Sequence, residues 1–206
     1  MYTTDNAPIK LTAASAQSNS REPQTYFHAL GTAIARKWES ANWDSNRFPD
    51  IAATSLARSV PHQSIAWADI VQWLHSTSDL PQQGDLDNPF GEPPLHVYVH
   101  PRFYIQALFW INSSIAIHQH GFCGAFTLLS GASLESLYRF SPTRRVNEHL
   151  LLGELERTHC HVLQPGTVRQ IVAGNSFIHA VSHIEVPCVT IIVRTSHNQE
   201  AGPQYR

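Results

Sequence analysis

The stretch Ile117–Gly131, IHQHGFCGAFTLLSG, places two histidines one residue apart in a run that is typical of a β-strand. Side chains two residues apart on a strand point to the same face, so His118 and His120 would present both imidazoles to one point in space. Such a pair is half of a metal site, because imidazole nitrogen binds several transition metals. The alternative interpretation is two solvent-facing histidines on an ordinary strand.

A third ligand for such a site is available later in the chain, in the segment GNSFIHAVSH. His179 follows an apolar Phe-Ile pair at the start of a predicted strand, and a β-barrel can bring that strand beside the one that carries His118 and His120. His183 lies in the same segment and is an alternative third ligand. With three neutral imidazoles, the remaining positions around an ion would be open to water, oxygen or substrate.

The composition indicates a globular chain whose partner is a small molecule. The 206 residues are 42% hydrophobic and 15% charged, with a formal net charge of −2, which suits one domain with a sizeable core. No run of Lys or Arg appears, so neither a nucleic acid nor an anionic membrane is an expected partner. Three cysteines without CxxC spacing argue against a disulfide scaffold. Because no signal-like start or long apolar segment is seen either, we expect a soluble, cytoplasmic protein.

Composition and hydrophobic periodicity divide the chain into four parts. Residues 1–22 are rich in small polar residues and poor in large apolar ones, so we expect a disordered tail there. Apolar residues at helical intervals predict two or three amphipathic helices within 23–78, which we interpret as a helical extension packed on a barrel. We assign the barrel to 95–198 and a C-terminal tail without a role to 199–206.

Short strands predict the architecture of the second half. From Pro94 onward, alternating or apolar runs are bounded by turn residues. Their close spacing without intervening helices excludes a parallel βαβ sheet and favours an antiparallel sandwich or barrel. A second HxH pair, His159 and His161, lies in one of these runs but lacks the glycine-rich turn of the first pair. We therefore interpret it as part of a half-exposed strand.

The order of these motifs resembles that of the cupins, which are jelly-roll barrels that hold one metal ion. HxH, a glycine-rich interval, an apolar strand that ends in Ser-Gly, and a lone histidine before a last apolar strand follow one another in the cupin order. The closer resemblance is to cysteine dioxygenase and the wider thiol dioxygenases, which join N-terminal helices to a three-histidine iron cupin. Trp110, Phe126, Gly131 and Glu135 stand where that family has similar residues. The resemblance implies an all-β, antiparallel cupin jelly-roll barrel with an N-terminal helical extension.

Departures from the family pattern refine what the resemblance implies for the metal. Most cupins have a glutamate ligand after HxH, whereas Gly124 and Ala125 stand in that place here. This fits a three-histidine site made by His118, His120 and His179, with Fe(II) as the expected ion and Zn, Ni or Mn as alternatives. The cysteine that crosslinks to a tyrosine in animal cysteine dioxygenases is replaced by Ala125, so no such crosslink is expected.

The last strand departs from the family as well. Thr190, Ile192 and Arg194 stand where the family has Ser, His and Tyr, so cysteine itself is not the expected substrate. Alternation points Arg194 inward, where its guanidinium would hold a carboxylate or phosphate bidentately; a surface ion pair is the alternative. On the neighbouring strand FYIQALFW, Tyr104 and Gln106 share one face. The predicted substrate-binding residues are Arg194, Tyr104, Gln106, Thr190 and Trp110.

These observations predict a mononuclear non-haem Fe(II), O₂-dependent oxygenase of the cysteine dioxygenase-like class, acting on a small acidic substrate. Its partners would be that substrate and O₂, and a homodimer through an edge strand or the helices is compatible with such a barrel. One alternative is an O₂-independent metal cupin, an isomerase or lyase, which needs a general base. The other is a cupin that binds a small ligand without turnover. The candidates for the base are Glu135, Glu185, Tyr104 and His183.

Overall fold

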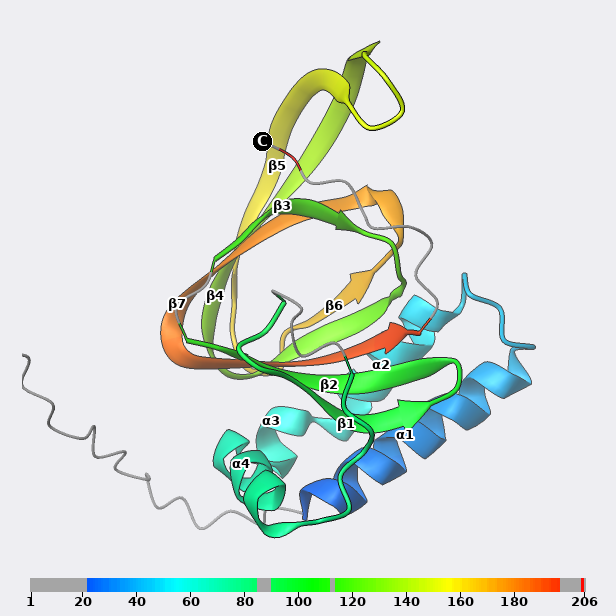
Figure 1. The fold of residues 1–206 in the computed structure, drawn as a ribbon, viewed down its shortest axis with the longest axis vertical. Helices are drawn as coiled ribbons and strands as arrows, with labels where there is room; N and C mark the ends of the chain where they lie inside the picture. The colour runs from blue at the N-terminus through cyan, green and yellow to red at the C-terminus, as the bar shows by residue number, and fades with distance from the viewer. Residues whose placement is uncertain (1–21, 85–89, 112–113, 197–204, 206) are drawn as a thin grey trace, which may run out of the picture.

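The computed structural model describes residues 22–84, 90–111, 114–196 and 205, and shows a helical layer on one side of an antiparallel β-barrel (Figure 1). The tails predicted at 1–22 and 199–206 lie outside the described residues, apart from Glu22 and Tyr205. In the described chain the helices lie within residues 23–76 and the strands begin at Pro94.

Four helices make up the first part of the described chain, where the sequence predicted two or three. They are α1 (Pro23–Ser40), α2 (Phe48–Ser59), α3 (Pro61–Ser64) and α4 (Trp67–Ser76). Helix α1 begins after Glu22, whose carboxylate accepts a hydrogen bond from the Thr25 backbone N–H. Its buried face carries Phe27, Leu30 and Ile34 at helical spacing. No described helix is both long enough and apolar enough to cross a bilayer.

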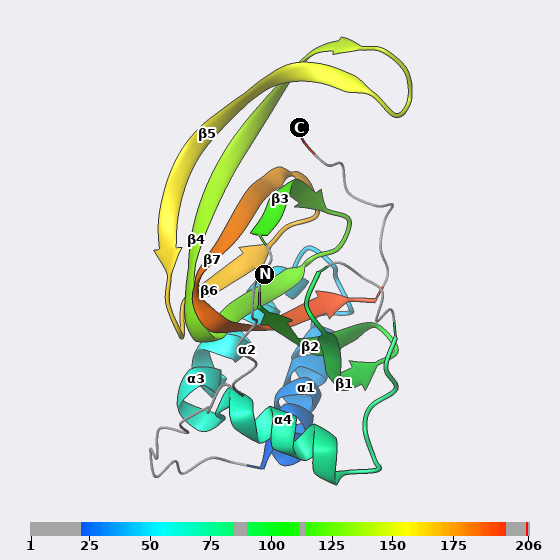
Figure 2. The same ribbon diagram turned by 60° about the vertical axis from the view of Figure 1, so that its left-hand side comes forward.

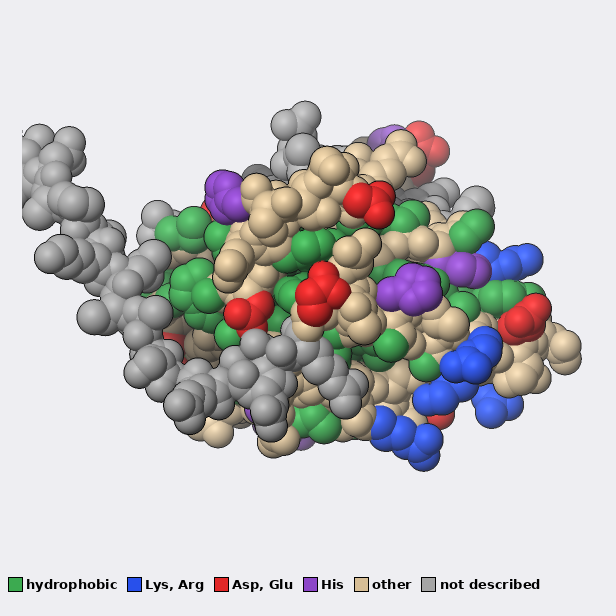
Figure 3. Space-filling view, turned by 90° about the horizontal axis from the view of Figure 1, so that it is seen from below, with side chains coloured by type: hydrophobic (Ala, Val, Ile, Leu, Met, Phe, Trp, Pro, Cys, Tyr) green, Lys and Arg blue, Asp and Glu red, His purple; other side chains and the backbone are tan. Residues whose placement is uncertain are grey.

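The helices cover one outer face of the barrel. Helices α1 and α2 pack against β1, β2, β6 and the first half of β4 (Figures 1 and 2). Seen from the helix side, Lys and Arg side chains gather at one edge, and acidic, apolar and histidine side chains are mixed over the rest (Figure 3). Large side chains such as Phe27, Phe48 and Phe103 are fully buried between the helices and the sheet. The helices thus close one side of the barrel and leave its interior to the strands.

Seven antiparallel strands form the barrel. They are β1 (Pro94–His100), β2 (Phe103–Trp110), β3 (Ser114–His120), β4 (Gly124–Arg145), β5 (Leu151–Leu163), β6 (Val168–Ile171) and β7 (Gly174–Thr195). The strand order is β1-β2-β7-β4-β5, with β3 beside β7 and β6 beside β4. The predicted fold class, an antiparallel all-β barrel with an N-terminal helical extension, is confirmed.

Two long, bent strands, β4 and β7, pass through both walls of the barrel (Figure 2). The first half of β4 pairs with the second half of β7, as in Ala125 opposite Val193, and the second half of β4 pairs with the first half of β7, as in Glu135 opposite Val181. The sequence predicted only short strands after Pro94, whereas β4 and β7 are 22 residues long each. That prediction was wrong because irregular register between Leu128 and Ser133 bends the strand without ending it.

Gly131 lies at the bend of β4 and is required there by its backbone. Its φ is +78°, and a Cβ atom would lie 2.7 Å from the Glu185 carbonyl oxygen and 2.8 Å from the Cys188 Cα atom. A residue with a side chain would therefore meet both an unfavourable φ and a steric clash. Gly174 has a similar φ of +86°, but no atom lies within 4 Å of the corresponding Cβ position.

These two glycines provide a matched test of the bend. We expect Gly131→Ala to destabilise the protein by about 3 kcal/mol, because backbone strain and overpacking add. Gly174→Ala, which has the strain alone, should cost about 1 kcal/mol. The free energies of unfolding are measured by urea denaturation of the metal-free proteins. Equal losses in the two variants would show that close packing at the bend is not what fixes it.

Candidate metal centre

Three histidines from two neighbouring strands meet inside the barrel. His118 and His120 lie on the same face of β3, and His118 is directly opposite His179 on β7. All three are buried, and one ligand nitrogen from each lies within 4.8 Å of the others. The structure thus brings together the three histidines that the sequence predicted as a set.

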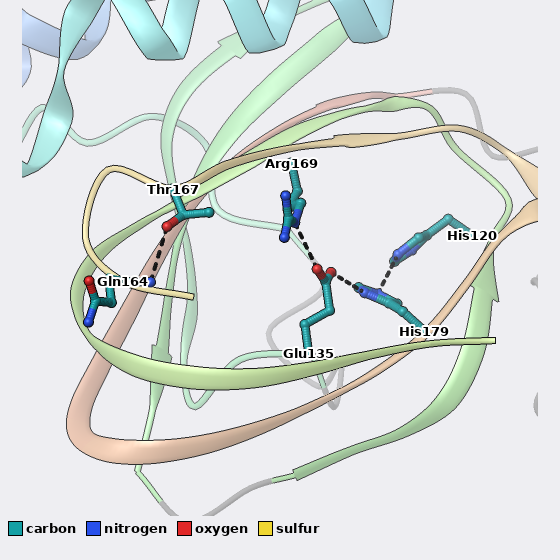
Figure 4. Close-up of polar contacts among 6 residues, drawn as sticks. All are labelled: His120, Glu135, Gln164, Thr167, Arg169 and His179. Carbon is teal, nitrogen blue, oxygen red and sulfur yellow. Dashed lines mark hydrogen bonds and ion pairs between the residues drawn. The ribbon is translucent and has the colours of Figure 1, made fainter. Parts of the chain in front are cut away.

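The hydrogen bonds of the imidazoles direct their Nε2 atoms toward one point. The His118 Nδ1–H donates to the Ala116 carbonyl oxygen at 2.8 Å, which leaves a buried Nε2 with no partner. The His179 Nδ1–H donates to Glu135 Oε1 at 3.0 Å, and its Nε2 faces the His120 Nε2 at 3.0 Å (Figure 4). An unpartnered buried nitrogen such as His118 Nε2 is costly, and an ion held by the three imidazoles would satisfy it.

The spacing of these nitrogens suits ligands of one ion. Two nitrogens about 2.1 Å from an ion lie about 3.0 Å apart at a right angle and about 3.4 Å apart at a tetrahedral angle. The 3.0 Å between the Nε2 atoms of His120 and His179 matches the right angle. This distance and the clustering of the three ligand nitrogens fit residues that would together hold one ion.

Glu135 fixes the orientation of His179 by accepting a hydrogen bond from its Nδ1 atom. Its side chain is fully buried on β4, where one oxygen accepts from His179 and the other forms a 2.8 Å ion pair with Arg169 Nε of β6 (Figure 4). Burial raises the pKa of Glu135, but the hydrogen bond from His179 and the Arg169 guanidinium outweigh it and hold the pKa below its ordinary value. A carboxylate that accepts Nδ1–H fixes the tautomer and makes Nε2 a better ligand. Glu135 was one of the predicted candidates for a general base, whereas in the structure both of its carboxylate oxygens are bound, one to His179 and one to Arg169.

His118 and His120 are held in the neutral form that metal binding needs. Burial, together with the neighbouring His179, lowers the pKa of His118 to about 4. Burial, assisted by His179, His118 and the Arg194 guanidinium, holds the pKa of His120 well below its ordinary value. Protons therefore compete weakly with a metal ion for these nitrogens near neutral pH.

A small cavity of about 80 Å³ opens in front of the histidines. Most of its wall is apolar and comes from β2, β3, β4, β6 and β7 of the barrel. The apolar lining consists of Phe90, Leu108, Trp110, Ile115, Phe122, Phe126, Leu128, Ile171, Val181 and Ile192. The polar lining consists of the three histidines with Gln106, Ser133, His183, Thr190 and Arg194. A cavity of this size suits a small molecule with few polar groups.

Four of the five predicted substrate-binding residues line this cavity. Arg194 is 8% exposed, and its guanidinium carbon lies 3.6 Å from the centroid of the Phe122 ring. Gln106 is buried beside it on β2, and the Thr190 hydroxyl accepts a 3.1 Å hydrogen bond from Trp110 Nε1. Tyr104 is the exception: it is not part of the wall, and its ring packs against Arg194 at 5.3 Å.

The other residues that the sequence suggested as ligands or bases are not part of the three-histidine cluster. His183 lines the cavity but is not part of the three-histidine cluster, and Glu185 is exposed. His159 is exposed on β5 and His161 is half-buried, as the half-exposed strand predicted. The residue that sequence reasoning missed is Arg169. No local signal marks it, because its ion pair with Glu135 depends on the register of three strands.

Comparisons with known proteins place the chain among distant structural relatives only. No family model and no curated protein matches it. Among solved structures, a DMSP lyase from Ruegeria pomeroyi is 11% identical, with 87% of this chain and 96% of that chain covered and a TM-score of 0.46. A hydroquinone 1,2-dioxygenase from Sphingomonas sp. TTNP3 is 10% identical over 59% of this chain and 79% of that chain, with a TM-score of 0.38. A cupin superfamily protein from Desulfitobacterium hafniense is 15% identical over 57% of this chain and 94% of that chain, with a TM-score of 0.34.

Similarities this distant carry no argument about function. The antiparallel barrel with three buried histidines on β3 and β7 is nevertheless the arrangement that the motifs predicted. The predicted antiparallel barrel is confirmed, and the resemblance to the cupins stays a prediction, as does the finer resemblance to cysteine dioxygenase.

The role of Glu135 is tested by Glu135→Gln, with Glu185→Gln as the exposed control on the same barrel. We expect Glu135→Gln to weaken metal binding by about 10- to 100-fold, because a neutral amide supports the His179 tautomer less well. Anaerobic titration with Fe(II) and, separately, with Zn(II) against a competing chelator measures the affinity. An unchanged affinity would mean that Glu135 only fills space beside His179.

Burial of neutral His118 makes the stability of the metal-free protein depend on pH. The pKa is about 4 in the folded protein and 6.5 when unfolded, so the unfolded chain binds the extra proton and stability falls as pH drops from 6.5 toward 4. Between pH 7 and pH 5 this residue alone should lose about 2 kcal/mol. Urea denaturation should show a correspondingly smaller loss in His118→Gln. The same loss in both proteins would contradict burial of a neutral imidazole.

Proposed function

We propose that this protein is a mononuclear non-haem Fe(II) oxygenase that uses O₂ and acts on a small substrate with an acidic group, other than cysteine. The observation that carries the proposal is the ligand set: three neutral imidazoles, with no carboxylate among them, face a small apolar cavity that also contains an arginine. The antiparallel barrel and the buried three-histidine cluster support a metal-dependent enzyme of the cupin kind in general. The assignment of iron as the ion and of O₂ as a substrate is the more specific part of the proposal.

Neutral ligands set the charge of the centre. His118, His120 and His179 contribute no negative charge, so a divalent ion keeps its full charge and attracts an anionic substrate group. The chemistry that a ferrous ion supplies when bound in such a site is electron transfer to O₂. The protein's own contribution is to bind, orient and enclose the reactants.

Arg194 provides the group that would bind the acidic end of the substrate. Its side chain is buried in the wall near His120, and the aromatic rings of Phe122 and Tyr104 lie against it. Rings on which a guanidinium stacks restrict its orientation, which favours bidentate binding of a carboxylate. Gln106, on the same wall, adds an amide that can donate to or accept from the same group.

The apolar remainder of the wall excludes water. Leu108, Phe126 and Leu128, from β2 and β4, line the cavity together with Ile115 and Val181, from β3 and β7. With little water present, the attraction between Arg194 and a carboxylate is screened less than at a surface. The same wall offers O₂, an apolar molecule, an environment that it prefers to water.

An O₂-independent reaction at the same centre would need a general base. Both oxygens of Glu135 are engaged and Glu185 is exposed, so His183 is the candidate that remains in the described cavity wall. The experiment below separates oxygenation from two alternatives. One is this isomerase or lyase reaction with Zn, Ni or Mn as the ion, and the other is ligand binding without turnover.

The test is O₂ uptake by protein purified without chelators or a histidine tag and loaded anaerobically with Fe(II). We expect uptake with at least one member of a panel of small hydroxy, mercapto and amino carboxylic acids. His118→Ala should abolish uptake, since it removes a ligand, and Arg194→Met should raise KM by about 10-fold or more with a smaller effect on kcat. His159→Ala, which changes a histidine of the exposed HxH pair, is the matched control.

The outcomes separate the alternatives. Uptake that requires Fe(II) and is retained in His159→Ala supports the oxygenase. Turnover of an acid without O₂ uptake, or with Zn, Ni or Mn in place of iron, overturns it in favour of the isomerase or lyase. Acid binding with no turnover under any metal leaves only a binding function.

A further inference from the structure

His183 is held in one orientation in the cavity wall. Its Nδ1 atom hydrogen-bonds the hydroxyl of Ser133 at 2.9 Å, and these two residues are directly opposite each other on β7 and β4. The Trp110 indole stacks on the imidazole, with ring centroids 4.6 Å apart and an angle of 18° between the planes. Trp110 is fixed in turn by its hydrogen bond to Thr190.

The restrained ring leaves one nitrogen unused. The Nε2 atom of His183 is buried and has no hydrogen-bond partner among the described residues. Burying a hydrogen-bonding nitrogen without a partner costs free energy, so a ligand that supplies the partner would recover that cost. Burial also lowers the pKa of His183 to about 4, so the imidazole is neutral near pH 7. It therefore offers a hydrogen bond and no charge.

His183 and Arg194 lie toward opposite ends of the cavity. Arg194 is opposite Tyr104, at the start of β2, whereas His183 stacks on Trp110, at the end of β2. His183 and Arg194 both line the same small cavity, so a short ligand can meet both, and the rest of the wall is largely apolar.

We propose that His183 Nε2 hydrogen-bonds a hydroxyl group of the substrate, and that the substrate class is small hydroxy acids with an apolar middle, a carboxylate at Arg194 and a hydroxyl at His183. This rests on the proposed function for the carboxylate end and extends it to the other end. His183 is a substrate-binding residue in this assignment, and Ser133 is a positioning residue that acts through it.

A hydroxyl fits because the tautomer of His183 has two possible states. Ser133 lies between the His183 Nδ1 and the Cys188 Sγ, 3.3 Å away, and its single hydroxyl proton can point to either. If the proton points to His183, Nε2 carries a hydrogen and donates; if it points to Cys188, Nε2 accepts. A hydroxyl both donates and accepts, so it is complementary to both states.

The test compares straight-chain acids from propionate to hexanoate with their ω-hydroxy derivatives, by calorimetric titration of Zn(II)-loaded protein. Binding is thereby measured without turnover. We expect at least one ω-hydroxy acid to bind about 3- to 10-fold more tightly than its parent acid in the wild type. In His183→Phe, which keeps a ring to stack on Trp110, this preference should disappear while the parent acid binds within twofold of the wild type.

Further variants keep the test informative. Ser133→Ala should reduce the hydroxyl preference without changing metal content, because it releases the imidazole. Arg194→Met should weaken both members of each pair equally. His183→Asn, whose shorter side chain does not reach as far, replaces His183→Phe if circular dichroism shows that the latter is unfolded, and it should also lose the preference.

The failure of this inference is distinguishable from failure of the oxygenase. Equal binding of every hydroxy acid and its parent in the wild type, or a preference that persists in the His183 variant, overturns the role of His183 and leaves the oxygenase standing. A preference that disappears in the variant, with no O₂ uptake by the Fe(II) protein, supports His183 and overturns the oxygenase. Binding of no acid at all overturns the substrate class.

Discussion

The pairing of β4 with β7 is the interaction on which the metal centre and the cavity depend. Both strands bend, so each contributes one half to either wall of the barrel. The pairing places Glu135 opposite Val181, within diagonal reach of His179, and places Ser133 opposite His183. A shift of one residue would turn Glu135 and His179 to opposite faces and separate them. Bulges and the backbone of Gly131 hold the register where the strands bend.

Polar groups inside the barrel are arranged as short chains that end at the cavity. Arg169, Glu135 and His179 form one such chain, and Cys188, Ser133 and His183 form the other. In each chain the inner partner satisfies Nδ1 of an imidazole and leaves Nε2 for something outside the protein. Because an unsatisfied buried polar group is costly, both chains are stable only as complete units. The two Nε2 atoms differ in what they face, since one is among ligand nitrogens and the other is beside an indole.

Local spacing in the sequence predicted much of the site. Alternation along a strand put His118 with His120, and Thr190 with Ile192 and Arg194, on inward faces, because side-chain direction on a strand depends only on parity between bulges. Tyr104 points to the same face of β2 as Gln106, but its ring packs against Arg194 and does not reach the cavity. Alternation along a strand predicts the face to which a side chain points, but not how far it lies from the cavity. Arg169 and the partners of Glu135 depend on which strands pair and in what register, and no short stretch of one sequence contains that information. The continuous bend of β4 was missed because Gly131 reads as the end of a strand.

The distance along the chain between the ligand histidines has a consequence for how the protein acquires its ion. His118 and His120 are near neighbours, but His179, which follows His120 by 59 residues, joins them only when β3 pairs with β7. Contacts between segments this far apart form slowly, and two imidazoles alone bind an ion weakly. A chain with this arrangement would fold first and select its ion afterwards, in contrast to a zinc finger, in which the ion drives folding. Which metal is bound then depends on what reaches a finished, rigid site, and the supply of ions at the time of loading becomes part of what determines the activity.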